Sequence, residues 1–331
     1  MGATQVVNGI VCVYEAKRVM VCNVYTGEIT WLPSISCDDS DFDSYSNSKS
    51  NYNSSYTTVS GYYFGYDPVN GVYKLLGISS SVFSFRGDLS VRKRAHIITL
   101  SPSSTASTSS SSWRKLHTAH IEPLTFPQES FLFNGLLYWV VDGGLGNQQR
   151  GLICLDLNTE EFHFIKPPQE PIFSGDYCSR WRIARFMERL AVLVPGKEDP
   201  PESLVIYTLD NNNYEDGSSV SSSWTRHTIP FPPGFGGSDR FDILPVGNLP
   251  TGQILLNKIC LSRNSNSHCK PHYTPVYSYD HRTNKFEKFV AGDLSFNPFV
   301  TFHYFPCSIS YTLEENSVPL DVLFRSARVE R

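Results

Sequence analysis

Acidic residues that could act as a catalytic pair recur along this chain. Four aspartates each follow an apolar run and begin a polar turn: Asp67, Asp156, Asp210 and Asp280. Carboxylates from distant segments can meet in space, and two of them suffice for glycoside hydrolysis. An aspartate that begins a turn can instead accept hydrogen bonds from the backbone of that turn. Because the four occupy equivalent places, we expect the structural role, and a carbohydrate-binding or hydrolytic propeller stays the alternative.

Two groups of residues have the types that bind metal ions. These are Cys260, His268, Cys269 and His272 for zinc, and Asp39, Asp41 and Asp43 for calcium. A calcium loop of the EF-hand type needs Gly at its sixth position and Glu at its twelfth, where Ser44 and Ser50 stand. The zinc-type residues are divided between an expected strand and a polar loop. Nucleophile-elbow, zinc-protease and phosphate-loop motifs are also missing. We therefore predict no catalytic residue, no metal and no cofactor, and we name no partner-binding residue.

The four aspartates belong to the second of two short sequence phrases that recur along the chain. The first is a turn followed by an apolar run, at 8–14, 134–141, 188–194 and 252–256. The second is an apolar run that ends in a polar turn, at 21–27, 63–71, 153–159, 205–210 and 276–283. Short apolar runs bounded by turn residues are typical of strands. The repeats thus predict a chain of short strands and tight turns.

The spacing of the repeats predicts the architecture. The residues that begin the turn of the second phrase, Asn23 and the four aspartates, are separated by 44, 89, 54 and 70 residues. We interpret the first interval as one unit, the second as two, and the others as units with insertions. A unit of about 45 residues made of strands is typical of a propeller blade. We therefore predict an all-β, kelch-like β-propeller of about six or seven blades, with residues 1–331 in a single domain.

Four polar segments interrupt this pattern, near residues 36–60, 101–112, 211–223 and 262–272. Their Ser, Asn and Asp content cannot bury enough apolar surface to order them independently. We interpret them as long loops that project from a propeller face and contribute to the choice of partner. Neutral change in tolerated loops is the alternative explanation.

Tryptophans and one ambiguous segment test this interpretation. Residues 179–194 have the spacing of an amphipathic helix, but 186–190 align with the repeat at 133–136, so we favour strand–turn–strand there. All five tryptophans lie in or beside strand phrases: Trp31, Trp113, Trp139, Trp181 and Trp224. We expect them to pack between blades rather than to be exposed.

The composition argues against several classes of protein. The net charge is −4 and residues 92–94 are the only basic cluster, which is too small for a nucleic-acid surface. No apolar run approaches the roughly 18 residues of a membrane helix, and the first residues do not resemble a signal peptide. The eight cysteines show no disulfide framework. We expect a cytoplasmic or nuclear protein with no nucleic-acid or membrane partner.

At the repeated phrases the sequence resembles the plant F-box-associated domain, a kelch-like propeller module that follows an F-box. The likeness is carried by residues 7–13, 22–33, 64–74, 133–139 and 276–286, which together span almost the whole chain. The phrase F-G-Y-D-P-V-N-G-V-Y-K at 64–74 is the most specific of them.

The resemblance implies a non-catalytic module that captures a target protein for a cullin–RING ubiquitin ligase of the SCF type. In that family a Skp-type adaptor binds the F-box, so the adaptor and the cullin are implied partners. Only residues 1–7 precede the first strand phrase, and we detect no F-box in them. A truncated piece of an F-box protein, without present function, is therefore a further alternative.

Overall fold

The computed structural model describes most of the first 289 residues. The described ranges are 2–15, 18–35, 52–85, 88–100, 112–117, 124–127, 130–143, 151–168, 170, 181–195, 202–210, 223–233, 235, 241–248, 251–260 and 276–289. Within these ranges the chain forms twenty-one strands and no helix. Accordingly, none of the described segments is a helix that could span a membrane. The expectation of an all-β fold is confirmed.

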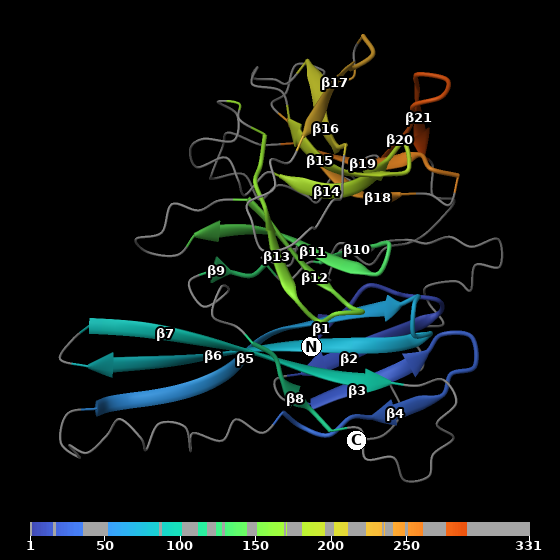
Figure 1. Ribbon diagram of the computed structural model, residues 1–331. Helices are drawn as coiled ribbons and strands as arrows, with labels where there is room; N and C mark the ends of the chain where they lie inside the picture. Colours follow the sequence, from blue (N-terminus) through green and yellow to red (C-terminus); the bar gives the residue numbers. More distant parts are fainter. Residues whose placement is uncertain are drawn as a thin grey trace. The chain divides into compact units, whose positions relative to one another are not determined.

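Strands that follow one another in sequence also lie side by side, and they form five antiparallel sheets (Figure 1). The first sheet contains β1 (Gly2–Ala3), β2 (Ile10–Glu15), β3 (Arg18–Asn23) and β4 (Ile29–Trp31). The second contains β5 (Tyr52–Asp67), β6 (Val72–Phe85), β7 (Asp88–Leu100) and β8 (Arg114–Lys115). The third contains β10 (Phe131–Phe133), β11 (Leu136–Gly143), β12 (Gly151–Asp156) and β13 (Phe162–Ile165), with β9 (Leu124–Thr125) added beside β11.

The last two sheets have the same consecutive order. The fourth contains β14 (Arg182–Phe186), β15 (Arg189–Pro195), β16 (Ser203–Leu209) and β17 (Trp224–Pro230). The fifth contains β18 (Phe241–Asn248), β19 (Ile254–Cys260), β20 (Val276–Asp280) and β21 (Lys285–Phe289). The described residues divide after Phe164 into two compact units, the first with three sheets and the second with two.

In the first unit, the second sheet packs against the other two through its opposite faces. Leu75 belongs to a buried cluster with Cys12 of the first sheet. Its neighbour Leu76 belongs to a cluster with Trp139 of the third sheet. This division follows from the strand period of two, which sends neighbouring side chains to opposite faces. Burial of each large apolar side chain contributes about 1.5–3 kcal/mol, so both faces stabilise the sheet.

The second unit has one core between its two sheets. Phe186 and Ile206 of the fourth sheet pack with Ile254 and Tyr279 of the fifth. Asn248 adds a polar link, because its side chain both accepts from the backbone N–H of Arg185 at 2.9 Å and donates to the Arg185 carbonyl at 2.6 Å. The amide of Asn248 thus pairs with β14 much as a neighbouring strand would.

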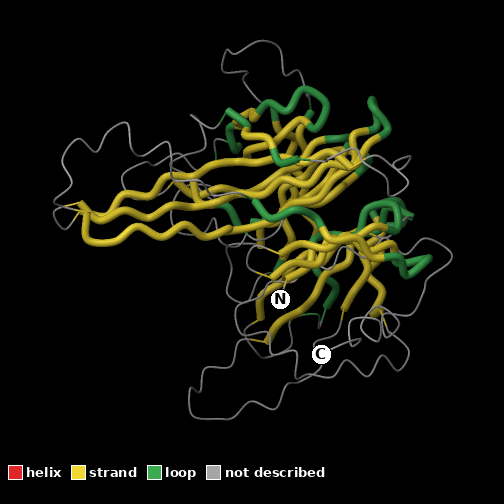
Figure 2. The backbone as a smooth tube through the Cα atoms, turned by 90° about the horizontal axis from the view of Figure 1, so that it is seen from below, coloured by secondary structure: helices red, strands yellow, loops and turns green. Residues whose placement is uncertain are grey.

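Long strands in the second sheet change the interpretation of the repeat spacing. Strands β5, β6 and β7 have 16, 14 and 13 residues and extend together as a ribbon (Figure 2). Strands of about 5–6 residues are usual. Asp67 lies in the second sheet and Asp156 in the third, so the interval of 89 residues contains one step from a sheet to the next and not two. Our interpretation of this interval as two units was wrong. The expected loop at 36–60 is also too long, since β5 begins at Tyr52 within it.

Blade number and domain number stay predictions. The described residues provide five sheets, and the chain after Phe289 lies outside them. The remaining residues of the four expected insertions also lie almost wholly outside the described ranges. Their proposed role in partner choice stays untested.

Three two-residue turns lead into the second strands of their sheets, β2, β11 and β15, with the same backbone. The φ angles are 49° and 76° at Asn8-Gly9, 50° and 78° at Asn134-Gly135, and 51° and 56° at Met187-Glu188. Positive φ at both positions is the type I′ hairpin geometry, which favours Asn-Gly. The third turn confirms strand–turn–strand over helix for the ambiguous segment. It also shows that Met187 and Glu188 adopt a conformation that suits neither residue.

We expect the double substitution Met187→Asn with Glu188→Gly to stabilise the protein. Left-handed backbone costs an ordinary residue about 1–2 kcal/mol, and Asn-Gly removes most of that cost. Glu188 makes an ion pair with Arg185 at 3.7 Å, but exposed pairs of this kind contribute little. Thermal unfolding should show a rise in Tm of about 2–4 °C. The control is Glu188→Gln, which removes the ion pair alone, and an unchanged or lower Tm for the double variant would contradict the argument.

Candidate functional site

The repeated turns use their first side chain to bond their own backbone. The side-chain oxygen accepts one or two backbone N–H groups within the turn at 2.7 to 3.4 Å in four copies: Asn23, Asp67, Asp156 and Asp280. Asp210 instead accepts from Thr225 Oγ1 at 2.8 Å and from Arg189 at 3.0 Å. Of the four aspartates, the expected structural role is confirmed for Asp67, Asp156 and Asp280. It is wrong for Asp210, which bonds side chains of neighbouring strands and not its own turn.

The fifth residue of these turns has a left-handed backbone in every described copy. The φ angles are 74° at Gly27, 67° at Gly71, 64° at Glu160 and 54° at Asn284. Glycine, and to a lesser degree asparagine, adopts this conformation at little cost. Glutamate does not, so Glu160 is the exception that needs an explanation.

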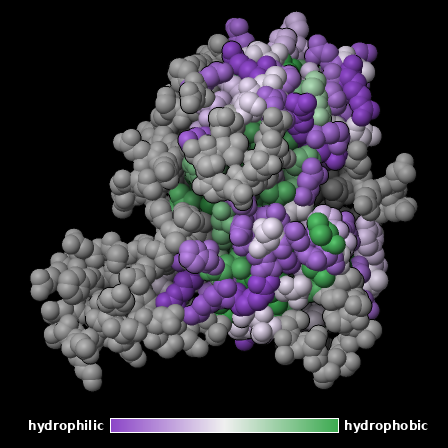
Figure 3. Space-filling view, viewed as in Figure 1, coloured by the Kyte–Doolittle hydropathy of each residue, from purple (hydrophilic) through white to green (hydrophobic). Residues whose placement is uncertain are grey.

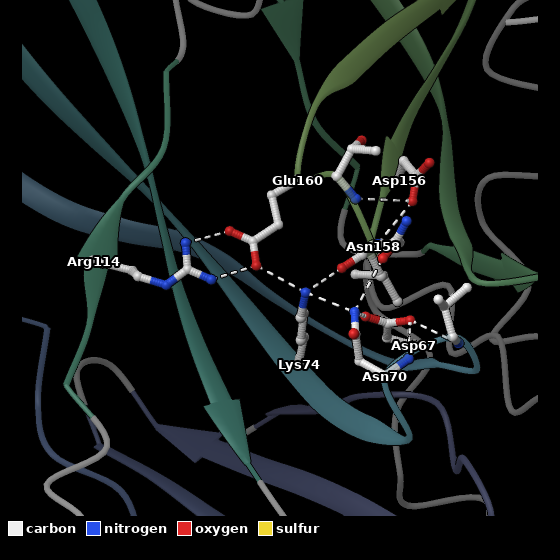
Figure 4. A network of polar contacts seen from close by, with 10 residues as sticks. Asp67, Asn70, Lys74, Arg114, Asp156, Asn158 and Glu160 are labelled. Carbon is white, nitrogen blue, oxygen red and sulfur yellow. Dashed lines mark hydrogen bonds and ion pairs between the residues drawn. The ribbon is translucent and has the colours of Figure 1, made fainter.

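Glu160 belongs to a network of charges that explains its presence (Figure 4). Its carboxylate lies 2.8 Å from Lys74 Nζ and accepts two hydrogen bonds from the guanidinium of Arg114. Lys74 also lies 3.4 Å from Asp67 Oδ2 and donates to the carbonyl of Leu157. Two of the four side chains are almost completely buried, Asp67 with 0% and Lys74 with 6% of their surface exposed.

The network connects the second and third sheets. Asp67 ends β5, Lys74 lies in β6 and Arg114 begins β8, whereas Glu160 lies in the turn between β12 and β13, two residues before β13. Asn70 extends it, because its amide donates to Asp67 Oδ2 at 2.7 Å and to Asn158 Oδ1 at 3.0 Å. The two turns therefore lie against each other (Figure 4).

The second and third sheets also approach each other closely at Gly135. A Cβ atom on Gly135 would lie 2.8 Å from Cδ of Pro68, which is too close without a shift. Gly135 also accepts a hydrogen bond from the backbone of Leu157 at 3.1 Å. The glycine of the Asn-Gly turn thus supplies space for the proline of the neighbouring turn as well as the positive φ.

Sequence reasoning missed this site for a topological reason. The turn at Asp67 connects the first and second strands of its sheet, whereas those at Asn23, Asp156 and Asp280 connect the third and fourth. The only signal was that the phrase at 63–71 lacks the companion phrase that the other copies have. Nothing in the spacing indicates that Lys74, Arg114 and Glu160 meet.

The surroundings of the Asp67 and Glu160 carboxyl groups favour the ionised form of both. Burial raises the pKa of Asp67, but hydrogen bonds from Asn70 and Val69 and the charge of Lys74 outweigh it, so the pKa is lowered. Burial likewise opposes ionisation of Glu160, and hydrogen bonds and charge from Arg114 and Lys74 lower its pKa. A general acid of a glycosidase needs a raised pKa. This pair therefore lacks the acid that hydrolysis requires and serves to hold two sheets together.

The metal candidates fall mostly outside the described residues. Cys260 is the last residue of β19, but His268, Cys269 and His272 are not in the described ranges, and neither are the acidic residues 39–43. In the part of the chain that is described, no three His, Cys, Asp or Glu side chains are placed to hold a metal ion. The prediction of no metal stays a prediction.

Tryptophans are mostly packed, as expected. Trp139 and Trp181 are buried. Trp113 immediately precedes β8 and Trp224 begins β17, which are the outer strands of their sheets. Each donates its indole N–H to a carbonyl, Trp113 to Pro33 at 2.6 Å and Trp224 to Lys166 at 2.9 Å. The expectation fails for Trp31, which is 64% exposed.

Trp31 is exposed because of its place in the first sheet. It lies on the edge strand β4 and pairs with Met20, whereas the neighbouring pair of Val21 and Thr30 points to the opposite face. Val21 packs towards the second sheet. Trp31 therefore lies on the face that no described cluster covers. On the face that Figure 3 shows, the coloured residues are mainly hydrophilic, with smaller hydrophobic groups among them.

We expect substitution of Glu160 to destabilise the protein even though its backbone is strained. Glu160→Gln leaves Lys74 with one anionic partner fewer at a cost of about 3 kcal/mol. Glu160→Gly loses the same charge but relieves about 1 kcal/mol of backbone strain, so it should unfold at a higher denaturant concentration than Glu160→Gln. The control is Glu161→Gln, an exposed neighbour whose effect should stay within about 0.5 kcal/mol. Equal stability of the Glu160→Gln and Glu161→Gln variants would show that the network contributes nothing.

The lowered pKa values predict how this contribution depends on pH. Asp67 and Glu160 have folded pKa values below their ordinary values of about 4, so the unfolded chain binds more protons in acid. Their contribution is complete above about pH 5 and is lost as the pH falls through the folded values. The difference in unfolding free energy between wild type and Glu160→Gln should therefore shrink below about pH 4. Urea unfolding from neutral to acidic pH measures it, and a constant difference would refute the assignment.

Comparisons with known proteins agree with this geometry. A family model described as the F-box associated beta propeller domain matches residues 1–311. The chain is 24% identical over 322 residues to the putative F-box protein At4g38870 of Arabidopsis thaliana, covering 94% of this chain and 62% of that protein. It is 22% identical to the F-box protein At1g30790 and to the F-box/kelch-repeat protein At3g04660 of the same plant, covering 77% and 76% of this chain and 56% of each.

The extent of these matches decides what they establish. The chain spans about three-fifths of the length of the curated relatives that it matches. The match therefore does not assign the activities or partners of the full-length relatives to this chain. The family model, by contrast, covers nearly all of the chain and agrees with its consecutive four-stranded antiparallel sheets. The chain belongs to the F-box-associated β-propeller family.

Proposed function

We propose that this chain is the substrate-recognition part of an SCF-type cullin–RING ubiquitin ligase and has no catalysis of its own. The observation that carries the proposal is the family match over residues 1–311, together with relatives that are named F-box proteins. A target protein is the direct partner, and a Skp-type adaptor and a cullin are partners through an F-box.

The chemistry of the described residues supports recognition rather than catalysis. Three of the repeated turn acids, Asp67, Asp156 and Asp280, bond their own backbone. The carboxylates of Asp67 and Glu160 are paired with cations of the protein itself. A rigid scaffold that presents loops from its sheet ends is a common basis for binding. Aromatic side chains dominate many protein interfaces, and Tyr25 and Trp31 are both more than half exposed.

The state of the cysteines supports a place in the cytoplasm or nucleus. Cys12 and Cys22 are free thiols, and Cys12 is buried. Burial raises the pKa of the Cys12 thiol, so it is protonated and unreactive. Free buried thiols are usual in reducing compartments. We therefore propose that target capture takes place there.

The test is to express the chain alone and fused behind the F-box segment of one of the Arabidopsis relatives, in plant cells. Proteins that co-purify with both forms are candidate targets. We expect the abundance of at least one to fall with the fusion and to recover when the cullin is inactivated. The control is the same fusion with an F-box that cannot bind the adaptor, which should bind the target without lowering its abundance. If no protein binds both forms, or if bound proteins are never depleted, the proposal fails.

A further inference from the structure

The sequence contains three Asn-Gly pairs, and each lies in a turn. They are Asn8-Gly9, Asn70-Gly71 and Asn134-Gly135, and all three asparagines are exposed. Asparagine is chemically labile. It is most labile before glycine, because glycine has no Cβ to shield the backbone nitrogen that attacks the side-chain amide. The sequence alone therefore makes the three pairs equally reactive, and any difference between them comes from the fold.

The pair Asn70-Gly71 is held at both of its reacting groups. Nδ2 of Asn70 donates to Asp67 Oδ2 at 2.7 Å and to Asn158 Oδ1 at 3.0 Å. The backbone N–H of Gly71 donates to the Asp67 carbonyl at 2.9 Å. An attack of the Gly71 nitrogen on the side chain of Asn70 has to break all three hydrogen bonds. The fold therefore protects this pair.

The pair Asn134-Gly135 has no such protection. Within the described ranges, neither the Asn134 side chain nor the Gly135 N–H makes a hydrogen bond. Gly135 is partly exposed, so water and hydroxide can reach its nitrogen. Asn8-Gly9 has the same type of turn, but Gly9 is buried, and a Cβ atom on it would lie 1.9 Å from the ring of Tyr25. Asn134-Gly135 is thus the most accessible of the three pairs.

We propose that Asn134-Gly135 is a site of spontaneous deamidation. The Gly135 nitrogen forms a bond to Cγ of Asn134, the bond from Cγ to Nδ2 breaks, and ammonia leaves with the proton of the Gly135 N–H. The intermediate is a succinimide ring. Water then opens the ring at either of its carbonyl carbons, and residue 134 becomes aspartate or isoaspartate. The reaction consumes water, releases ammonia and involves no oxidation, enzyme or cofactor.

Isoaspartate at this position should weaken the contact between the second and third sheets. It adds a carbon atom to the main chain of a two-residue turn, and the type I′ geometry does not accommodate a longer backbone. Gly135 accepts a hydrogen bond from the N–H of Leu157 at 3.1 Å and lies against Pro68. A longer turn displaces both contacts. The proposal is independent of target capture, because it concerns the stability of the chain itself.

The experiment is to incubate the full chain at mildly alkaline pH, both folded and in concentrated urea. Peptide mapping by mass spectrometry follows the loss of each asparagine and the formation of isoaspartate. In urea we expect the three pairs to react at similar rates. In the folded chain Asn70 should react about a hundredfold more slowly than Asn134, because three hydrogen bonds oppose the attack. The rate at Asn8 should lie between these two.

Two variants test the cause and the consequence. Asn158→Ala removes one acceptor of the Asn70 amide, so the rate at Asn70 should rise about fivefold. Asn134→Gly is the matched control, since Gly-Gly also suits a type I′ turn. After incubation the wild type should unfold at a lower denaturant concentration than before, whereas Asn134→Gly should keep its midpoint.

The result that overturns the site is a folded chain in which Asn134 reacts no faster than Asn70. An equal ratio of the two rates in the folded chain and in urea overturns it as well. If Asn134 reacts but the midpoint of the wild type does not fall, the proposed effect on the sheet contact is wrong. No partner protein enters the experiment, so its failure is distinct from failure of target capture.

Discussion

The buried ammonium group of Lys74 is the constraint on which the first unit depends. A charge removed from water is costly unless anions and acceptors surround it, and loss of one partner costs about 3–5 kcal/mol. Asp67 comes from the second sheet, whereas Glu160 and the Leu157 carbonyl come from the third. Lys74 is therefore satisfied only when the two turns lie against each other, and this requirement fixes the approach of two sheets that apolar packing alone would leave free to slide.

Two residues with a left-handed backbone that their type does not favour show how such a constraint acts on the choice of residue. Glu160 and Met187 both adopt a left-handed backbone that glycine or asparagine would adopt more easily. At Glu160 the carboxylate binds Lys74 and Arg114, and these ion pairs oppose the strain. Met187 is 44% exposed, and its neighbour Glu188 makes one exposed ion pair. Nothing described at that turn offsets its strain. The left-handed backbone is thus unfavourable at both turns, and only at Glu160 do ion pairs of the same residue oppose it.

Local features of the fold could be predicted from the sequence, whereas tertiary ones could not. Apolar runs and Asn-Gly or Asx turns indicate strands and hairpins because these depend on a few neighbouring residues. The meeting of Lys74 with Glu160, and of His96 with Lys115, depends on which strands pair. Exposure of Trp31 depends on β4 being an edge strand. A single sequence contains no signal for these pairings, since each joins segments that are separated by a turn or a loop of variable length.

The distribution of charge in the first unit bears on what a ligand could meet there. The acids of the network are turned inwards, where Asp67 and Glu160 bind cations of the protein itself. Catalysis of hydrolysis needs a carboxyl group that keeps its proton near neutral pH, and the network holds both of its carboxyls ionised. The charged side chains of this network therefore hold two sheets of the first unit together.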